Sequence, residues 1–465
     1  MIFRNKLNLG IALIGISIGL VTGILGEMSL KPFIVLMIAL FLLGYFFVDF
    51  ERSVLGLLVI RSALDIFSAQ QLPAAYGIGI EFLAVLFVIV SLITANPIHT
   101  DKFWGFFVGW VVLQGVWLVL MLLGQLGFDS TYLLDSIREW IRLLLWPTIY
   151  LLVMQLRGQV APSRIISSMF LSLPIPLIIA SSQLLSGKLR VSSSFGHANA
   201  FATFLLLFIC LSWWQLSHTQ GHRWPWVVLL CILAFFLVST KALFSLTMLS
   251  VCVLVVIIPK VNPSKLIGGL LLIIFVFGLF ASSEFGRERL ESVQKTPLGN
   301  SEITISRAIL NSESDHNSFN WRLSQWHTVL KAWEQYPTFG YGLGLSKQSI
   351  NSNLLPHNDY IRAMAEGGIV GLVAFLSFFA ILCSYLFRLY QSASMHKPRQ
   401  DLYLILLALT ISTVIGMVTE NIWSHTVFFF YLSALISVAE WDWPVDKVSS
   451  RPHYFSEEAT KSLIH

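Results

Sequence analysis

Long apolar runs separated by short polar joints are the feature that most restricts how this chain can fold. A helix needs about 20 apolar residues to cross the hydrocarbon core of a bilayer, and runs of about that length recur along the whole sequence. With 56% hydrophobic and 12% charged residues, a chain of 465 residues could not hide this surface from water. Alternating β-barrel patterning is absent. The sequence therefore predicts an all-α polytopic membrane protein.

About fourteen membrane-spanning helices are expected, within a range of about 12 to 14. The first seven are predicted near Leu9–Leu25, Pro32–Val48, Val54–Phe67, Tyr76–Ala95, Phe103–Leu123, Ile141–Leu156 and Ile165–Leu185. The second seven are predicted near Ala198–Leu216, Pro225–Val238, Ala242–Ile258, Leu266–Ser282, Ile361–Tyr390, Leu402–Thr419 and Ile422–Val438.

This pattern divides the chain into four segments. Residues 1–282 are expected to form an N-terminal transmembrane bundle, and residues 360–440 a C-terminal set of transmembrane helices. Between them, residues 283–359 are hydrophilic and predict one long loop subdomain with amphipathic helices. Lys and Arg are more frequent in the joints that are cytoplasmic when the N-terminus is inside. This indicates an N-in and C-in topology, with an extracytoplasmic loop and a cytoplasmic tail at residues 441–465.

Composition and motifs argue against several other classes of protein. The net charge of +5 is spread along the inner joints and is not gathered into a basic domain, so no nucleic-acid partner is expected. The sequence contains no Walker loop, dinucleotide fingerprint or zinc signature. All four cysteines lie inside predicted spans, where their spacing suggests neither disulfides nor a metal site. Neither a cofactor nor a metal ion is therefore expected.

Three groups of polar residues and glycines stand out against the apolar background. His357 and Asn358 are followed by nine residues and then by Gly-x-x-Gly, with Gly368 and Gly371 in the last two places. The second group is an upstream Arg, Trp, Pro, Gly-x-Gly-x-Gly series, made of Arg322, Trp326, Pro337, Gly340, Gly342 and Gly344. The third is a shorter set just before and at the start of a predicted span, made of Arg190, Phe195, His197 and Asn199. Together these residues resemble the O-antigen ligase and polymerase superfamily of bacterial envelope glycosyltransferases.

The resemblance implies a function and a location. Such enzymes, with a GT-C-like helical fold, transfer a glycan from a polyprenyl diphosphate-linked donor to a hydroxyl of a lipid or glycan acceptor. The reaction would take place among membrane lipids at the outer face of the bacterial inner (plasma) membrane, without a metal ion, and with inversion at the anomeric carbon. Histidine suits this chemistry because imidazole can take a proton from a weakly nucleophilic sugar hydroxyl near neutral pH.

The resemblance also suggests roles for individual residues. His357 would be the general base, and Arg190, Lys241 and Arg322 would bind the diphosphate, whose charge basic side chains can neutralise. Interfacial snorkelling is the alternative for these three basic residues. The family usually has Ser-Arg where this chain has Thr240-Lys241, and lysine lacks the two-pronged geometry of arginine.

Four further residues are expected to support the site. Asn358 could bond the acceptor sugar or cap the helix that follows it. Glu366 lies four residues after Arg362, so it could orient Arg362 or the histidine, or form an intrahelical pair. His197 is expected to orient the start of its span.

Three functions remain compatible with the sequence. A ligase would attach a finished glycan to its acceptor, a polymerase would join lipid-linked repeat units, and a transporter would move the lipid-linked glycan without forming a bond. Transport is the least favoured, because the sequence shows no internal repeat. Ligase and polymerase share the donor chemistry and are not separated by these motifs.

Overall fold

The computed structural model describes residues 40–122, 130–259, 263–297, 299–300, 302–312, 317–350, 354–441 and 443. Within these ranges all regular elements are helical, as the sequence predicts. The N-terminal half contains α3 Phe50–Ile60, η2 Arg61–Gln70, α4 Leu72–Ile93, α5 Lys102–Gln114, α6 Val116–Leu122, α7 Ser130–Met154, α8 Pro162–Phe170, α9 Pro174–Leu185, η3 Ser193–Phe195 and α10 Ala198–His218. It is followed by α11 Trp224–Ser239, α12 Leu243–Ile257, α13 Pro263–Ser282, α14 Glu284–Gln294, α15 Ile305–Asn311, α16 Ser318–Trp333, η4 Gln348–Ile350, α17 Asp359–Ser392, α18 Lys397–Gly416, η5 Ile422–Ser424 and α19 Thr426–Glu440.

Seven helical segments of the described chain are long and apolar enough to cross a membrane. An eighth is obtained if the bent pair Ile267–Ser282 and Gly286–Gln294, whose axes meet at 89°, counts as one span. Three shorter apolar helices, α11, α12 and α19, pack among them. The chain is thus a multi-pass membrane protein.

The predicted total of about fourteen spans is not reached in the part that is described. The predicted spans from Val54 onward all fall on helices, but some of these helices are short, and α7 carries four charged side chains in its first half. The predicted span Leu9–Leu25 lies outside the described residues, as does the first part of Pro32–Val48, up to residue 39. The span count and the four segment boundaries therefore stay predictions, including the tail at 441–465, which is almost entirely outside the described residues.

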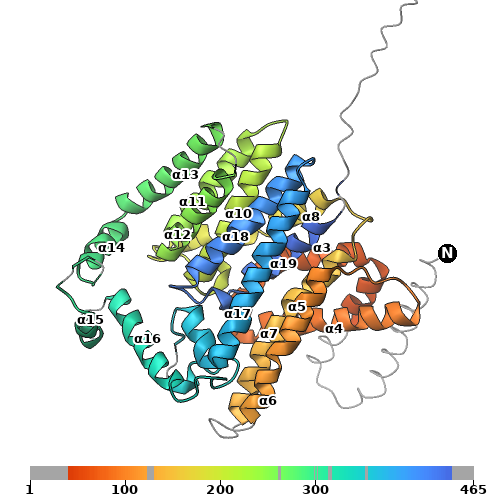
Figure 1. The fold of residues 1–465 in the computed structure, drawn as a ribbon. Coiled ribbons are helices and arrows are strands. Elements are labelled where there is room, and N and C mark those ends of the chain that lie inside the picture. The colour runs from red at the N-terminus through yellow and green to blue at the C-terminus, as the bar shows by residue number, and fades with distance from the viewer. Residues whose placement is uncertain are drawn as a thin grey trace, which may run out of the picture.

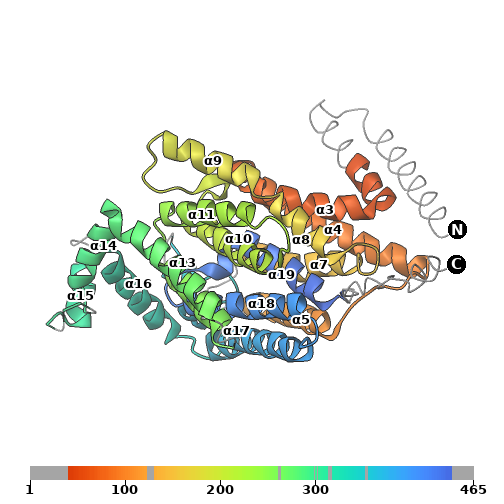
Figure 2. The same cartoon turned by 90° about the horizontal axis from the view of Figure 1, so that it is seen from above.

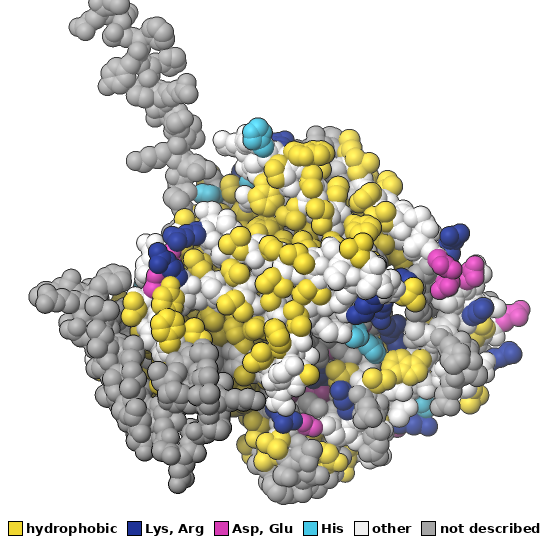
Figure 3. Space-filling view, turned by 180° about the vertical axis from the view of Figure 1, so that it is seen from behind, with side chains coloured by type: hydrophobic (Ala, Val, Ile, Leu, Met, Phe, Trp, Pro, Cys, Tyr) yellow, Lys and Arg dark blue, Asp and Glu magenta, His cyan; other side chains and the backbone are white. Residues whose placement is uncertain are grey.

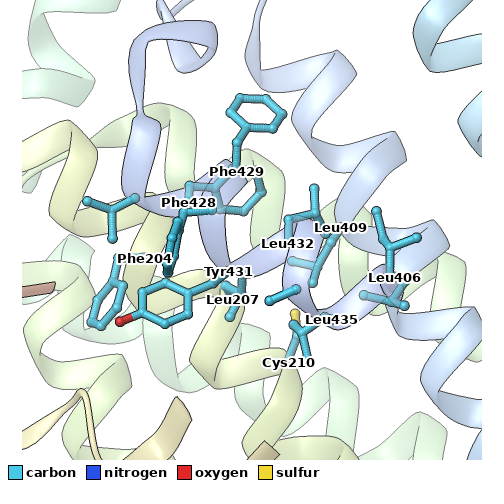
Figure 4. Close-up of a cluster of buried hydrophobic side chains, with 14 of the residues drawn as sticks. Phe204, Leu207, Cys210, Leu406, Leu409, Phe428, Phe429, Tyr431, Leu432 and Leu435 are labelled. Carbon is cyan, nitrogen blue, oxygen red and sulfur yellow. The ribbon is translucent and has the colours of Figure 1, made fainter. Parts of the chain in front are cut away.

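The helices α10 and α18 form the centre of the bundle. Both are buried along most of their length, and they pack against α11, α12, α17 and α19. In Figure 1, α10, α11, α12, α13 and α18 run side by side. Figure 4 shows Phe204 and Leu207 of α10, Leu406 and Leu409 of α18, and aromatic side chains of α19 meeting in one apolar cluster. Helices that are apolar on all sides suit this central position.

Outer helices keep large apolar side chains on the surface. Ile93, Ile178 and Ile274 are 74%, 68% and 64% exposed. A broad hydrophobic surface occupies much of the face in Figure 3, and the charged side chains gather towards its edges. Such a surface is stable in contact with lipid and not in water.

Residues 283–358 connect α13 to α17 and contain α14, α15, α16 and η4. Figures 1 and 2 both show α14, α15 and α16 at one edge of the molecule. The segment returns to the bundle through α16, which packs against α17. It thereby brings the polar loop before α17 back to one end of the central helices.

The helix α17 is broken at Gly368, whose φ of 62° and ψ of −160° are not helical. The Ile369 amide N–H then donates to the Pro337 carbonyl at 2.8 Å. A Cβ at residue 368 would lie 2.2 Å from the Thr338 carbonyl oxygen. Only glycine fits both this backbone conformation and this close approach. The break therefore joins the glycine-rich segment before residue 345 to the first turns of α17.

Candidate functional site

One end of the bundle brings together segments that are far apart in the sequence. The starts of α10, α17 and α19 meet the end of α18 there. His357 is in the loop before α17, in a left-handed backbone conformation with φ 51°. Its ring packs edge-on against Trp321 of α16, with centroids 5.7 Å apart. The loop itself is fixed by the Trp326 indole N–H, which donates to the Pro356 carbonyl at 2.7 Å.

Glu420 holds one nitrogen of the His357 ring. The His357 Nδ1 lies 3.1 Å from Glu420 Oε1, and this carboxylate is 3% exposed. The Glu420 carboxylate also accepts from the Asn421 amide N–H at 3.1 Å and from the Asn199 side-chain amide. Burial alone would raise the pKa of Glu420, but its hydrogen bonds, with His357 and with the Asn421 amide N–H, outweigh burial and lower the pKa to about 2. Glu420 is therefore an anion at neutral pH.

Arg190 joins the same network through Asn199. Its guanidinium donates to the Asn199 side-chain oxygen, and its Nε donates to the Thr240 carbonyl at 3.1 Å. Lys241 follows directly, with φ 54°, so its backbone lies beside the carbonyl that Arg190 binds. The structure thus brings Arg190 and Lys241 to the same end of the bundle as His357.

His197 and Asn358 occupy helix N-terminal positions. His197 is the N-cap of α10, and its Nδ1 accepts from the Asn199 amide N–H at 3.3 Å. Burial lowers the pKa of His197 below its ordinary value. Asn358 caps α17, because its side-chain oxygen accepts from the amide N–H groups of Tyr360 and Ile361 at 2.9 and 3.0 Å. The helix-capping interpretation of Asn358 thus has its expected hydrogen bonds.

Arg362 and Glu366 belong to a second charged network. The Arg362 Nε donates to Glu366 Oε1 at 2.8 Å, which is the intrahelical pair that the four-residue spacing suggests. The other two guanidinium nitrogens of Arg362 donate to Glu139 of α7 at 2.6 Å and to the Ser424 hydroxyl at 2.8 Å. Arg142 also pairs with Glu139. These charges stabilise contacts between helices and do not contact His357 in any described interaction.

A cavity of about 350 Å³ opens beside His357. Histidine and carboxylate side chains contribute to its wall, together with one lysine and apolar side chains from the loops and from α10 and α19. The polar lining residues are Asp65, His197, Lys347, His357, Glu420, Asn421, Ser424, His425 and Thr426. This volume is in the range of small-molecule binding sites.

None of the three predicted phosphate ligands, Arg190, Lys241 and Arg322, lines this cavity. Arg190 is linked to it through Asn199 and Glu420, and Lys241 directly follows Thr240, whose carbonyl Arg190 binds. Arg322 is half-buried on α16, next to Trp321, which contacts the His357 ring. Their assignment to the diphosphate stays a prediction. Among the described residues, no group of three or more His, Cys, Asp or Glu side chains is placed to hold a metal ion.

Several residues of the site were not predicted from the sequence. Glu420 is the most important of them, and Lys347 and His425 also belong to this group. One signal was available, because Glu420 is the single Asp, Glu, Lys or Arg between Leu402 and Ala439. A charge in the short joint between two apolar helices is costly near a membrane unless it is paired, so it indicates a functional or paired role.

Comparison with known proteins agrees with the resemblance found in the sequence. A family model described as O-antigen ligase matches residues 225–376. The matched part includes Lys241, Arg322 and His357, whereas Arg190 and Glu420 lie outside it. No curated protein matches the chain. The resemblance to the O-antigen ligase and polymerase superfamily is confirmed by the family match.

Proposed function

We propose that this chain, which the family match relates to O-antigen ligases and polymerases, is a glycosyltransferase that uses a lipid-linked donor. It would move a glycan from a polyprenyl diphosphate to an acceptor hydroxyl at the outer face of the inner membrane. Attachment of a finished glycan, as in a ligase, is the preferred reaction. Joining of repeat units, as in a polymerase, would use the same donor chemistry.

The observation that best supports this proposal is the His357–Glu420 pair at the wall of a cavity. Glu420 is an anion, so it favours the form of the His357 ring that carries a proton on Nδ1. The Nε2 nitrogen then keeps its lone pair, and it has no hydrogen-bond partner among the described residues. A histidine held in this way can act as a general base.

The proposed step moves one proton and exchanges one bond. The acceptor hydroxyl oxygen attacks the anomeric carbon of the donor while Nε2 of His357 takes the hydroxyl proton. The bond between the anomeric carbon and the diphosphate oxygen breaks, and its electron pair leaves with the diphosphate. Attack from the side opposite the leaving group inverts the configuration at the anomeric carbon. No metal ion is needed if fixed positive charges stabilise the leaving diphosphate.

The protein offers such charge from its backbone as well as from its basic side chains. The helix α19 begins at Thr426, and its N-cap, His425, gives no side-chain capping hydrogen bond. Thr426 and Val427 both line the cavity, so the positive end of the α19 dipole points towards it. Arg190, Lys241 and Arg322 are proposed to add to this field.

Purified protein in liposomes, supplied with a lipid-linked glycan donor and an acceptor, tests the proposal. One discrete product indicates ligation, a ladder of products indicates polymerisation, and no new glycosidic bond favours transport. Product formation should persist when a chelator is added.

The variant His357→Ala should form product at least about 10³-fold more slowly. The matched control is His327→Ala, because His327 is an exposed histidine of α16. A His357→Ala variant that folds and keeps the wild-type rate would refute the assignment.

A further inference from the structure

The charged side chains on the cavity wall differ in whether they are paired with an opposite charge inside the protein. The wall includes two carboxylates, Asp65 and Glu420, and Lys347 is the single Lys or Arg among the described lining residues. A diphosphate entering this space would meet both carboxylates. The cavity can bind it only if the negative charges are already neutralised and a positive charge remains available.

Asp65 is neutralised by an arginine behind the wall. The Arg61 guanidinium lies 2.7 Å from Asp65 Oδ1 and also donates to the Thr426 hydroxyl at 2.8 Å. This is the buried ion pair that the four-residue spacing of Arg61 and Asp65 suggests, since Arg61 is only 2% exposed. Glu420 is likewise committed, because His357, Asn199 and the Asn421 amide all bond to it.

Lys347, in contrast, is not paired with another described side chain. Its ammonium group makes no hydrogen bond or ion pair with any described residue, although the side chain is half-buried and lines the cavity. A half-buried lysine keeps its charge by reaching water or an anionic ligand. Lys347 is therefore the one cationic side chain on the described wall that is free to bind an anion.

The backbone around Lys347 is held firmly in place. The preceding Ser346 hydroxyl donates to Glu366 Oε1 at 2.8 Å, and Glu366 is fixed by Arg362. Earlier in the same loop, the Gly342 amide N–H donates to the Glu366 carbonyl at 2.8 Å. A Cβ at Gly340 would lie 2.5 Å from the Ala365 carbonyl oxygen, so the loop can approach α17 only with glycine there. The glycine-rich loop thus fixes the position from which Lys347 extends.

We propose that Lys347 binds the diphosphate of the lipid-linked donor inside this cavity, opposite the paired carboxylates. This inference rests on the proposed function for the identity of the anion. It also explains the Gly340–Gly344 series, because the packing of this loop against α17 would position Lys347 at the site. Lys347 and the proposed general base His357 are ten positions apart, so one short segment of the chain would supply both.

Binding of a polyprenyl diphosphate that carries no glycan tests the inference without requiring catalysis. The variant Lys347→Gln should bind it at least about tenfold more weakly than the wild type, as expected for a lost charge-assisted hydrogen bond. Lys347→Arg should recover most of this affinity, because it keeps the charge. The control Lys331→Gln changes an exposed lysine of α16 and should have no effect. Thermal unfolding of each variant in detergent verifies that the fold is retained.

Two additional ligands identify which anion is recognised. A polyprenyl monophosphate should lose less affinity than the diphosphate in Lys347→Gln. Equal losses for the diphosphate and for phosphatidylglycerol vesicles would overturn the inference, since they would indicate a general contact with anionic lipid. Unchanged diphosphate affinity in a folded Lys347→Gln would also overturn it. A protein that forms no glycosidic bond yet binds the diphosphate through Lys347 would refute the proposed function and support this site.

Discussion

Two networks of buried charge lie close together in this protein, and they differ in one respect. In the first, Arg362 uses all three guanidinium nitrogens on Glu366, Glu139 and Ser424. In the second, Glu420 is fully engaged, but its partner His357 has one ring nitrogen bonded and the other without a partner among the described residues. Both contain ionisable groups that membrane burial makes costly. In the proposed reaction, the catalytic residue would be recognised by a ring nitrogen that has no hydrogen-bond partner among the described residues and lies beside a cavity, and not by buried charge alone.

The strongest test of this comparison removes Arg362. In Arg362→Met the carboxylates of Glu366 and Glu139 stay buried while losing their shared partner. We expect a loss of about 3–5 kcal/mol in unfolding free energy. The measurement is unfolding in detergent. The control Arg138→Met removes an arginine of α7 that is 71% exposed and pairs with Asp135, and it should cost less than about 1 kcal/mol. Similar losses in both variants would contradict the structural role of the first network.

Removing the charge of Glu420 should instead affect the reaction. In Glu420→Gln the amide no longer favours a proton on Nδ1 of His357, so we expect kcat to fall about 10²-fold. The donor KM should change little, because Glu420 is committed to protein partners. Glu420→Asp should recover part of kcat. An unchanged kcat in folded Glu420→Gln would show that the His357–Glu420 pair is structural, like the Arg362 network.

His425 gives the protein a pH dependence at the same end of the bundle. Burial lowers the pKa of His425 to about 4, while the unfolded chain should keep a value near 6.5. Between these values the unfolded state binds more protons, so stability rises with pH in this window and falls on acidification. We expect a loss of roughly 2 kcal/mol between pH 6.5 and pH 5. The variant His425→Gln should flatten the dependence of Tm on pH, and His327→Gln should not. An equally steep profile in His425→Gln would rule out this cause.

The smallest effect is expected at Asn358. Its side chain caps α17 by accepting two amide N–H bonds, so Asn358→Ala should cost about 1 kcal/mol in stability. Asn358→Asp should retain the cap. Because the capping oxygen is already occupied, we expect the acceptor KM to stay near the wild-type value. A large increase in acceptor KM would favour direct contact of Asn358 with the sugar.

Local relationships could be predicted from the sequence more readily than distant ones. The cap at Asn358 and the pair Arg362–Glu366 depend on residues two to four positions apart, and helical geometry fixes such distances. The motif around His357 was found for the same reason. The helical class also followed from the apolar runs, since each helix satisfies its own backbone groups.

Contacts between distant segments were not predicted. Glu420 follows His357 by 63 positions and Asn199 by 221, and no periodic pattern relates them. Their meeting depends on how α10, α17 and α18 pack. Lys347 shows the same limit, because its place at the cavity depends on the docking of the glycine-rich loop against α17. The number of spans was similarly uncertain, since hydropathy does not say where an apolar run bends.

The break at Gly368 has a consequence for where the reaction would meet the lipid. Beyond it, residues 369–392 of α17 make 24 residues, which as a helix extend roughly 36 Å. That length already exceeds the hydrocarbon thickness of about 30 Å. The turns before the break, and His357 ahead of them, would then stand at headgroup depth. A lipid-borne leaving group would thus reach the imidazole while its isoprenoid tail stays dissolved in the bilayer.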